Sequence, residues 1–169
     1  MLLGCLLWVD AFNFANYPAK NIAKKMTHWA IWLTFIQIAI SLKCSMDVNI
    51  QRNRPCLLKA HYYLFELTTV LNIIVPMVYW NFLREGTIRD WEGIHVLQSS
   101  VCHSLPLVCT VINFCVTDVV IRASDSFYLI PIELLYSYFN YRTVKAQGYP
   151  VYWFLTWEDS NSFWVIGAL

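Results

Sequence analysis

The sequence predicts an all-α protein, a polytopic transmembrane helical bundle with four full spans and two shorter terminal hydrophobic segments, in a single domain over residues 1–169. Hydrophobic residues make up 58% of the chain and charged residues 14%, whereas ordinary soluble domains carry about 25% charged residues. This deficit of charged residues is spread along the whole chain, which argues for an integral membrane protein with several spans and one domain. The formal net charge of +1 excludes a basic surface for nucleic acid.

The first part of the chain predicts a short apolar segment followed by one full span. Met1–Phe14 is apolar except for Asp10 and Asn13 and is too short to cross a bilayer alone, so it is interpreted as the second half of a span or as a short interfacial helix. Met26–Leu42 is long enough, and Lys25 and Lys43 bound it with side chains that reach the lipid headgroups. We expect Lys43–Lys59 to form a polar loop.

Two further spans follow. Ala60–Leu83 contains Pro76, which predicts a kink, and it ends at a charged turn over Arg84–Glu92. His95–Thr117 has no charged residue, and His103 lies near its middle. A titratable group at that depth is costly in a bilayer and is therefore a candidate site.

The last part predicts a fourth, short span and a second half-span. Ser126–Tyr141 has Glu133 at its centre, and Ser160–Leu169 is apolar but too short to cross alone. The aromatic patch Val151–Trp157 suits a membrane interface. We expect membrane lipids as partners, together with other membrane subunits bound through the terminal half-spans, and no nucleic acid.

Two polar residues have matched predicted depths. Thr34 is the centre of the first span, and His103 lies two residues from the centre of the charge-free run 93–117. At about 1.5 Å rise per residue, their side chains are expected within a few ångströms in depth. A hydroxyl beside an imidazole is the minimum for an activated nucleophile. The alternative is that Thr34 bonds a carbonyl of its own helix and His103 bonds another helix.

Three residues are candidates for a supporting role. Gln37 is the other polar residue inside the first span, Asn113 lies at the end of the third, and Glu133 either orients His103 or is protonated among apolar side chains. Glu66 and Glu133 leave a lipid or ion transporter as a further alternative. The sequence predicts no metal site and no cofactor, since haem ligation requires histidines at matched depth and only His103 is central.

Four stretches of this sequence resemble one membrane family in the order in which they occur. They are WLTFIQ at 32–37, VPMVYW at 75–80, HSLPLVCTVIN at 103–113 and GYPVYWFLTWED at 148–159. The chain is similar over residues 20–165 to the androgen-induced membrane threonine hydrolases of fatty-acid esters of hydroxy fatty acids and to the related rolling stone proteins. The resemblance implies that Thr34 is the nucleophile and His103 its base. Asn113 stands where the hydrolases of the family have an acidic residue.

These observations lead to two functional hypotheses. One is a membrane hydrolase of lipid esters, expected in the endoplasmic reticulum or plasma membrane. The other is a non-catalytic accessory subunit that keeps the fold within a larger membrane complex, such as a respiratory-type assembly of the mitochondrial inner membrane.

Overall fold

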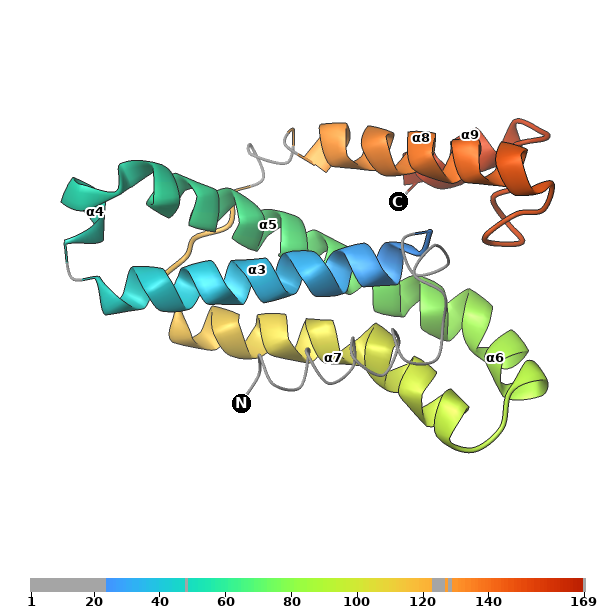
Figure 1. The fold of residues 1–169 in the computed structure, drawn as a ribbon, viewed down its shortest axis with the longest axis horizontal. Coiled ribbons are helices and arrows are strands. Elements are labelled where there is room, and N and C mark those ends of the chain that lie inside the picture. Colours follow the sequence, from blue (N-terminus) through green and yellow to red (C-terminus); the bar gives the residue numbers. More distant parts are fainter. Residues whose placement is uncertain (1–23, 48, 123–126, 128, 169) are drawn as a thin grey trace.

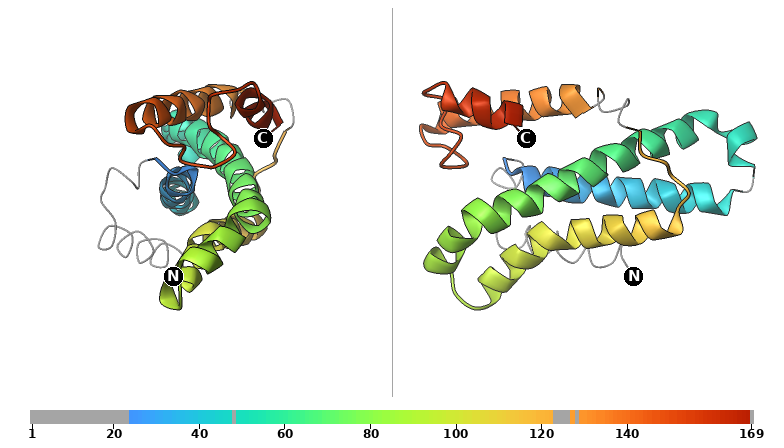
Figure 2. Two further views of the ribbon diagram at one scale, coloured as in Figure 1. Left: turned by 90° about the vertical axis from the view of Figure 1, so that its right-hand side faces the viewer. Right: turned by 180° about the vertical axis from the view of Figure 1, so that it is seen from behind.

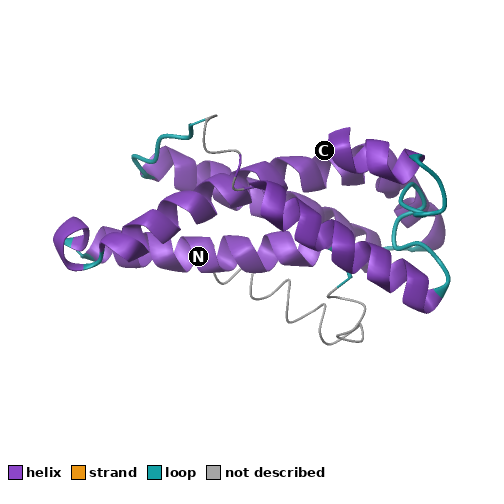
Figure 3. Ribbon diagram, turned by 90° about the horizontal axis from the view of Figure 1, so that it is seen from above, coloured by secondary structure: helices purple, strands orange, loops and turns teal. Residues whose placement is uncertain are grey.

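The computed structural model describes residues 24–47, 49–122, 127 and 129–168, and these residues form helices and loops without a strand (Figures 1 and 3). The all-α prediction is therefore confirmed for this part of the chain. In order, the helical elements are α3 (Met26–Met46), α4 (Ile50–Asn53), α5 (Pro55–Val78), the π-helical segment η1 (Tyr79–Leu83), α6 (Arg84–Asp90), α7 (Ile94–Val116), α8 (Leu129–Gln147) and α9 (Asn161–Ala168).

Three helical segments are long and apolar enough to cross a membrane: Met26–Met46, Pro55–Asp90 and Ile94–Val116. They lie side by side and alternate in direction, with α8 and α9 along one side of this bundle (Figures 1 and 2). The prediction of four full spans is not confirmed. The predicted fourth span is the helix Leu129–Gln147, which runs on through Arg142 and Lys145 and does not belong to the three apolar helices.

Only the C-terminal one of the two predicted half-spans lies within the described residues. The predicted segment Ser160–Leu169 contains the eight-residue helix α9. The predicted segment Met1–Phe14 lies outside the described residues.

The second span is longer than the sequence suggested. The helix continues through Pro76 and η1 into α6, so that Pro55–Asp90 covers 36 residues, or about 54 Å at 1.5 Å per residue. A bilayer core is about 30 Å thick. The prediction of a charged turn over Arg84–Glu92 is therefore wrong for most of its length, because Arg84–Asp90 is helical. Charged side chains suit a helix that has left the apolar layer, and Gly86 alone does not end it.

The buried faces of the three long helices repeat every three or four residues, as in helices that pack along a narrow seam. On α3 they include Thr27, Ala30, Thr34, Gln37 and Ser41. On α5 they include His61, Phe65, Thr68, Asn72 and Val75. On α7 they include Gln98, Cys102, Pro106, Cys109 and Asn113. Small and polar residues therefore meet at the centre beside the aliphatic side chains of Ile31, Ile38 and Leu71.

Large apolar side chains point outward instead. Exposed examples are Ile73, Met77, Leu97, Val108, Val111 and Phe114. Such a distribution suits a bilayer, because lipid tails are as apolar as leucine and helices associate there through close packing and interhelical hydrogen bonds.

Helix α3 holds the bundle together because it packs on both of its neighbours. Ile31 and Ile38 of α3 pack with Cys102 and Cys109 of α7. On its other side, Ala30 packs with Leu71 and Val75 of α5.

The segment after α7 crosses α5 on the side that faces the viewer in the right-hand view of Figure 2. There the Glu66 carboxylate, buried on α5, accepts the backbone N–H of Arg122 at 2.9 Å. Helix α8 then packs on the start of α3, where Trp29 meets Tyr136 edge to face with ring centroids 5.7 Å apart. The Lys24 ammonium also donates to the side-chain carbonyl of Gln147 at 2.7 Å.

Candidate functional site

Thr34 lies in the middle of the three-helix core and is fully buried. Its hydroxyl donates to the Ala30 carbonyl of its own helix at 2.7 Å and accepts from Asn72 Nδ2 of α5 at 2.7 Å. The same amide nitrogen donates to Thr110 Oγ1 of α7 at 2.7 Å and approaches the Pro106 carbonyl at 3.4 Å. One asparagine amide thus joins all three helices at this level.

A second polar layer lies further along the same core and contains two of the predicted supporting residues. Asn113 Nδ2 donates to Gln37 Oε1 at 3.2 Å, and the Ser41 hydroxyl donates to Asn113 Oδ1 at 3.3 Å. The structure therefore brings Gln37 and Asn113 together, but their contacts join α3 to α7 and neither reaches His103.

His103 occupies a different environment from Thr34. Its Nδ1 lies 2.6 Å from the Ser99 carbonyl oxygen. A carbonyl only accepts, so Nδ1 carries the proton, and in the neutral ring Nε2 keeps its lone pair. The ring stacks on Tyr79, the first residue of η1, with centroids 4.0 Å apart and planes inclined by 11°. The Tyr79 hydroxyl in turn lies 3.2 Å from Ser100 Oγ.

Thr34 and His103 lie at different levels of the bundle and form no hydrogen bond with each other. Thr34 bonds Asn72, whereas His103 stacks on Tyr79, and these two partners are seven residues apart on one helical segment. Seven residues correspond to about 10 Å along the axis. The expectation of matched depth is therefore corrected, because interhelical contacts set the axial register, and these do not align the centres of the apolar runs. The catalytic roles themselves stay a prediction.

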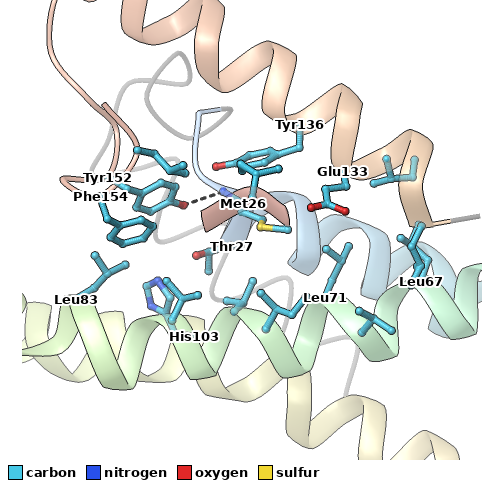
Figure 4. A pocket seen from close by; sticks show the side chains of 18 residues that line it. Met26, Thr27, Leu67, Leu71, Leu83, His103, Glu133, Tyr136, Tyr152 and Phe154 are labelled. Carbon is cyan, nitrogen blue, oxygen red and sulfur yellow. Dashed lines mark hydrogen bonds between the residues drawn. The ribbon is translucent and has the colours of Figure 1, made fainter. Parts of the chain in front are cut away.

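The threonine at the level of His103 is Thr27. It lies seven residues before Thr34 on α3, and α3 runs antiparallel to α5, so it falls opposite Tyr79. Both Thr27 and His103 line one pocket of about 120 Å³ (Figure 4). The Thr27 side chain is 4% exposed, and its hydroxyl has no hydrogen-bond partner among the described residues.

The pocket lies between the bundle and the C-terminal part of the chain. One wall is the aliphatic face of α5, formed by Leu67, Val70, Leu71, Ile74, Val75 and Val78. The opposite wall comes from α8 and the segment after it, with Glu133, Tyr136, Tyr152 and Phe154 (Figure 4). Glu133, the third predicted supporting residue, therefore shares the pocket with His103 but comes from its other side.

Tyr152 connects this C-terminal wall to the start of α3. Its hydroxyl accepts the backbone N–H of Met26 at 3.1 Å (Figure 4), and this N–H belongs to the first turn of the helix, where no carbonyl of the helix itself is available. Burial raises the pKa of the Tyr152 phenol above its ordinary value, so the phenol stays neutral there.

Sequence reasoning missed Asn72, Thr110, Tyr79 and Thr27. A usable signal existed for Asn72, since Thr68 and Asn72 are polar residues four apart inside an apolar run, as expected for a polar stripe facing other helices. No comparable signal marks Thr27, because its place in the pocket depends on α8 and on the segment after it.

Among the described residues no group of three or more His, Cys, Asp and Glu side chains is arranged to hold a metal ion. The chain matches no protein-family model, no curated protein and no solved structure.

Proposed function

We propose that this chain is a non-catalytic helical subunit of a larger membrane assembly, such as a complex of an energy-converting membrane. One observation carries the proposal: the Thr34 hydroxyl is fully buried and is engaged both as donor and as acceptor within the core. A hydroxyl in that position contributes to helix association and is inaccessible to a substrate.

The outer surface supports the same proposal. Helix α7 exposes a broad apolar face that includes Leu97, Val108, Val111 and Phe114, and such a face suits either lipid tails or the helices of a partner. In this proposal α8 is a fourth membrane-inserted helix, with Arg142 and Lys145 at its headgroup end.

The test is the size of the particle that contains this chain. The tagged chain is expressed in its source cells at low level, extracted in a mild detergent and run on a native gel beside the chain made alone. Migration well above a 19.8 kDa chain with its detergent, with loss of that species on adding a harsh detergent, is the expected result. A stable, discrete species of the single chain in the mild extract refutes the proposal.

A membrane hydrolase of lipid esters is the second candidate, and the open position of His103 favours it. The His103 Nε2 atom is available as a base in an apolar pocket, as acyl transfer from a lipid ester requires. In this candidate a threonine hydroxyl attacks the ester carbonyl, His103 takes the hydroxyl proton and gives it to the leaving alcohol, and water then releases the acyl group from the threonine. The family resemblance assigns the attack to Thr34, and Thr27 is the alternative nucleophile because it lines the same pocket as His103.

Labelling by a fluorophosphonate probe distinguishes these roles. If Thr34 is the nucleophile, T34A loses the label and T27A keeps it. Labelling that is lost only in T27A transfers the role to Thr27. Equal labelling of both variants and the parent chain, or no labelling of any of them, refutes the hydrolase and leaves the structural proposal standing.

A further inference from the structure

The pocket beside His103 combines an aliphatic lining with one fixed hydrogen-bond acceptor. We propose that it binds a long-chain primary alcohol whose hydroxyl donates to His103 Nε2. This site goes beyond the structural role proposed above, since that role requires no ligand. Three properties of the pocket carry the inference: the orientation of the imidazole, the volume, and the polar groups of the lining.

The imidazole is held before any ligand arrives. The hydrogen bond from Nδ1 to the Ser99 carbonyl, at 2.6 Å, fixes the tautomer, and the Tyr79 ring, stacked at 4.0 Å, fixes the plane of the ring. Nε2 is the ring nitrogen that remains, and it has no partner among the described residues. A ligand hydroxyl that bonds it therefore does not have to order the side chain, which lowers the entropic cost of binding.

The size and lining suit part of an alkyl chain. The pocket measures about 120 Å³, close to the roughly 150 Å³ of an apolar cavity that takes up benzene. The side chains of α5, together with Met26, Leu129 and Ile132, present aliphatic surface. The first few carbons of a chain fill such a space, and the rest of the chain leaves through the open side of the pocket.

The polar groups of the pocket select the head group. Glu133 brings a second carboxyl group to the wall opposite His103 (Figure 4), and no Lys or Arg is among the described residues that line the pocket, so a fatty-acid carboxylate would lose its hydration there without gaining a cation as partner. An ammonium head would lose more hydration in this apolar lining than a hydroxyl does. A neutral hydroxyl donates to His103 Nε2 and accepts from the Thr27 hydroxyl, which lines the same pocket.

The test uses the full chain in lipid nanodiscs and three photoreactive probes of equal chain length. They are diazirine-tagged dodecanol, its methyl ether, which lacks the hydrogen to donate, and the matching dodecanoic acid. H103F keeps an aromatic ring against Tyr79 and removes Nε2, and I132W fills the pocket from the α8 side. H61F is the matched control, because His61 is a buried histidine of α5 outside the pocket.

We expect saturable labelling by dodecanol on peptides of α5 and α8. H103F and the methyl ether should each weaken apparent binding about fivefold, as for one neutral hydrogen bond. I132W should abolish labelling, H61F should leave it unchanged, and the acid should label less than the alcohol. Equal labelling by alcohol and ether, by alcohol and acid, or by H103F and the parent chain would overturn the proposal. Native-like elution of each variant shows that it is folded.

Discussion

The amide of Asn72 allows a stringent test of how this core is held together. Its Nδ2 donates to Thr34 Oγ1 and Thr110 Oγ1, both at 2.7 Å, with the Pro106 carbonyl at 3.4 Å as a weaker alternative. Interhelical hydrogen bonds in membranes contribute about 0.6 kcal/mol on average and up to about 1.7 kcal/mol. We therefore expect T110V, and likewise T34V, to lower the free energy of unfolding by about 1 kcal/mol each.

The double variant T34V/T110V should lose more than the sum of the two single losses. In each single variant the freed N–H of Asn72 still has the Pro106 carbonyl within reach, whereas in the double variant only one of its two N–H groups finds an acceptor. A buried donor without a partner costs about 1–3 kcal/mol. The excess over additivity should therefore be at least about 1 kcal/mol.

Adding N72L to the double variant should restore much of this stability. Leucine removes the unpaired donor, and it also removes Asn72 Oδ1, which is buried without a hydrogen-bond partner. Replacing every partner of a buried network by apolar groups of similar shape is nearly neutral. The triple variant T34V/N72L/T110V should thus be more stable than T34V/T110V.

The assay is reversible unfolding in mixed micelles with increasing sodium dodecyl sulfate, followed by tryptophan fluorescence. T69V is the matched control, because the Thr69 hydroxyl bonds only the Phe65 carbonyl of its own helix, at 2.7 Å, and its removal should change stability by less than about 0.5 kcal/mol. Strict additivity of T34V and T110V, or a triple variant less stable than the double, would show that Asn72 does not join the helices as described.

Three further perturbations probe other parts of the fold. E66A should speed amide hydrogen exchange at Arg122 about fivefold by removing the carboxylate that accepts its N–H. Y152F should lower stability by about 1 kcal/mol, because the N–H of Met26 loses its acceptor. Burial raises the pKa of Tyr152. The stabilisation by Tyr152 is therefore complete below about pH 10 and is lost as the pH rises through the raised pKa. The free energies of unfolding of the parent chain and Y152F should thus converge at alkaline pH. G93A should destabilise by about 1–3 kcal/mol in the same unfolding assay, because Gly93 has φ 56°.

Each of these has its own control and contrary outcome. E66Q keeps a side-chain oxygen as acceptor and should exchange like the parent chain, so equal effects of E66A and E66Q would reject the hydrogen bond as the cause. A difference between the parent chain and Y152F that persists unchanged above pH 11 would contradict the titration. G86A is the control for G93A: Gly86 is helical with open space around it, and alanine there should be neutral or stabilising.

The sequence by itself determined that the chain is helical and where two of its apolar helices lie. The predicted spans Met26–Leu42 and His95–Thr117 agree closely with the helices Met26–Met46 and Ile94–Val116. The physical reason is local. In lipid, the backbone N–H and C=O groups of an uncharged run need hydrogen-bond partners, and a helix supplies all of them from within the same run.

The relative placement of the helices was decided by the tertiary structure alone. The depths of Thr34 and His103 were inferred from the centres of apolar runs, but a helix slides along its neighbour until side chains such as Asn72 and Thr110 meet their partners. These contacts join residues 38 positions apart in the chain, and no local pattern encodes them. The pocket depends on the same long-range packing, since His103 and Tyr152 come from segments that only the fold brings together.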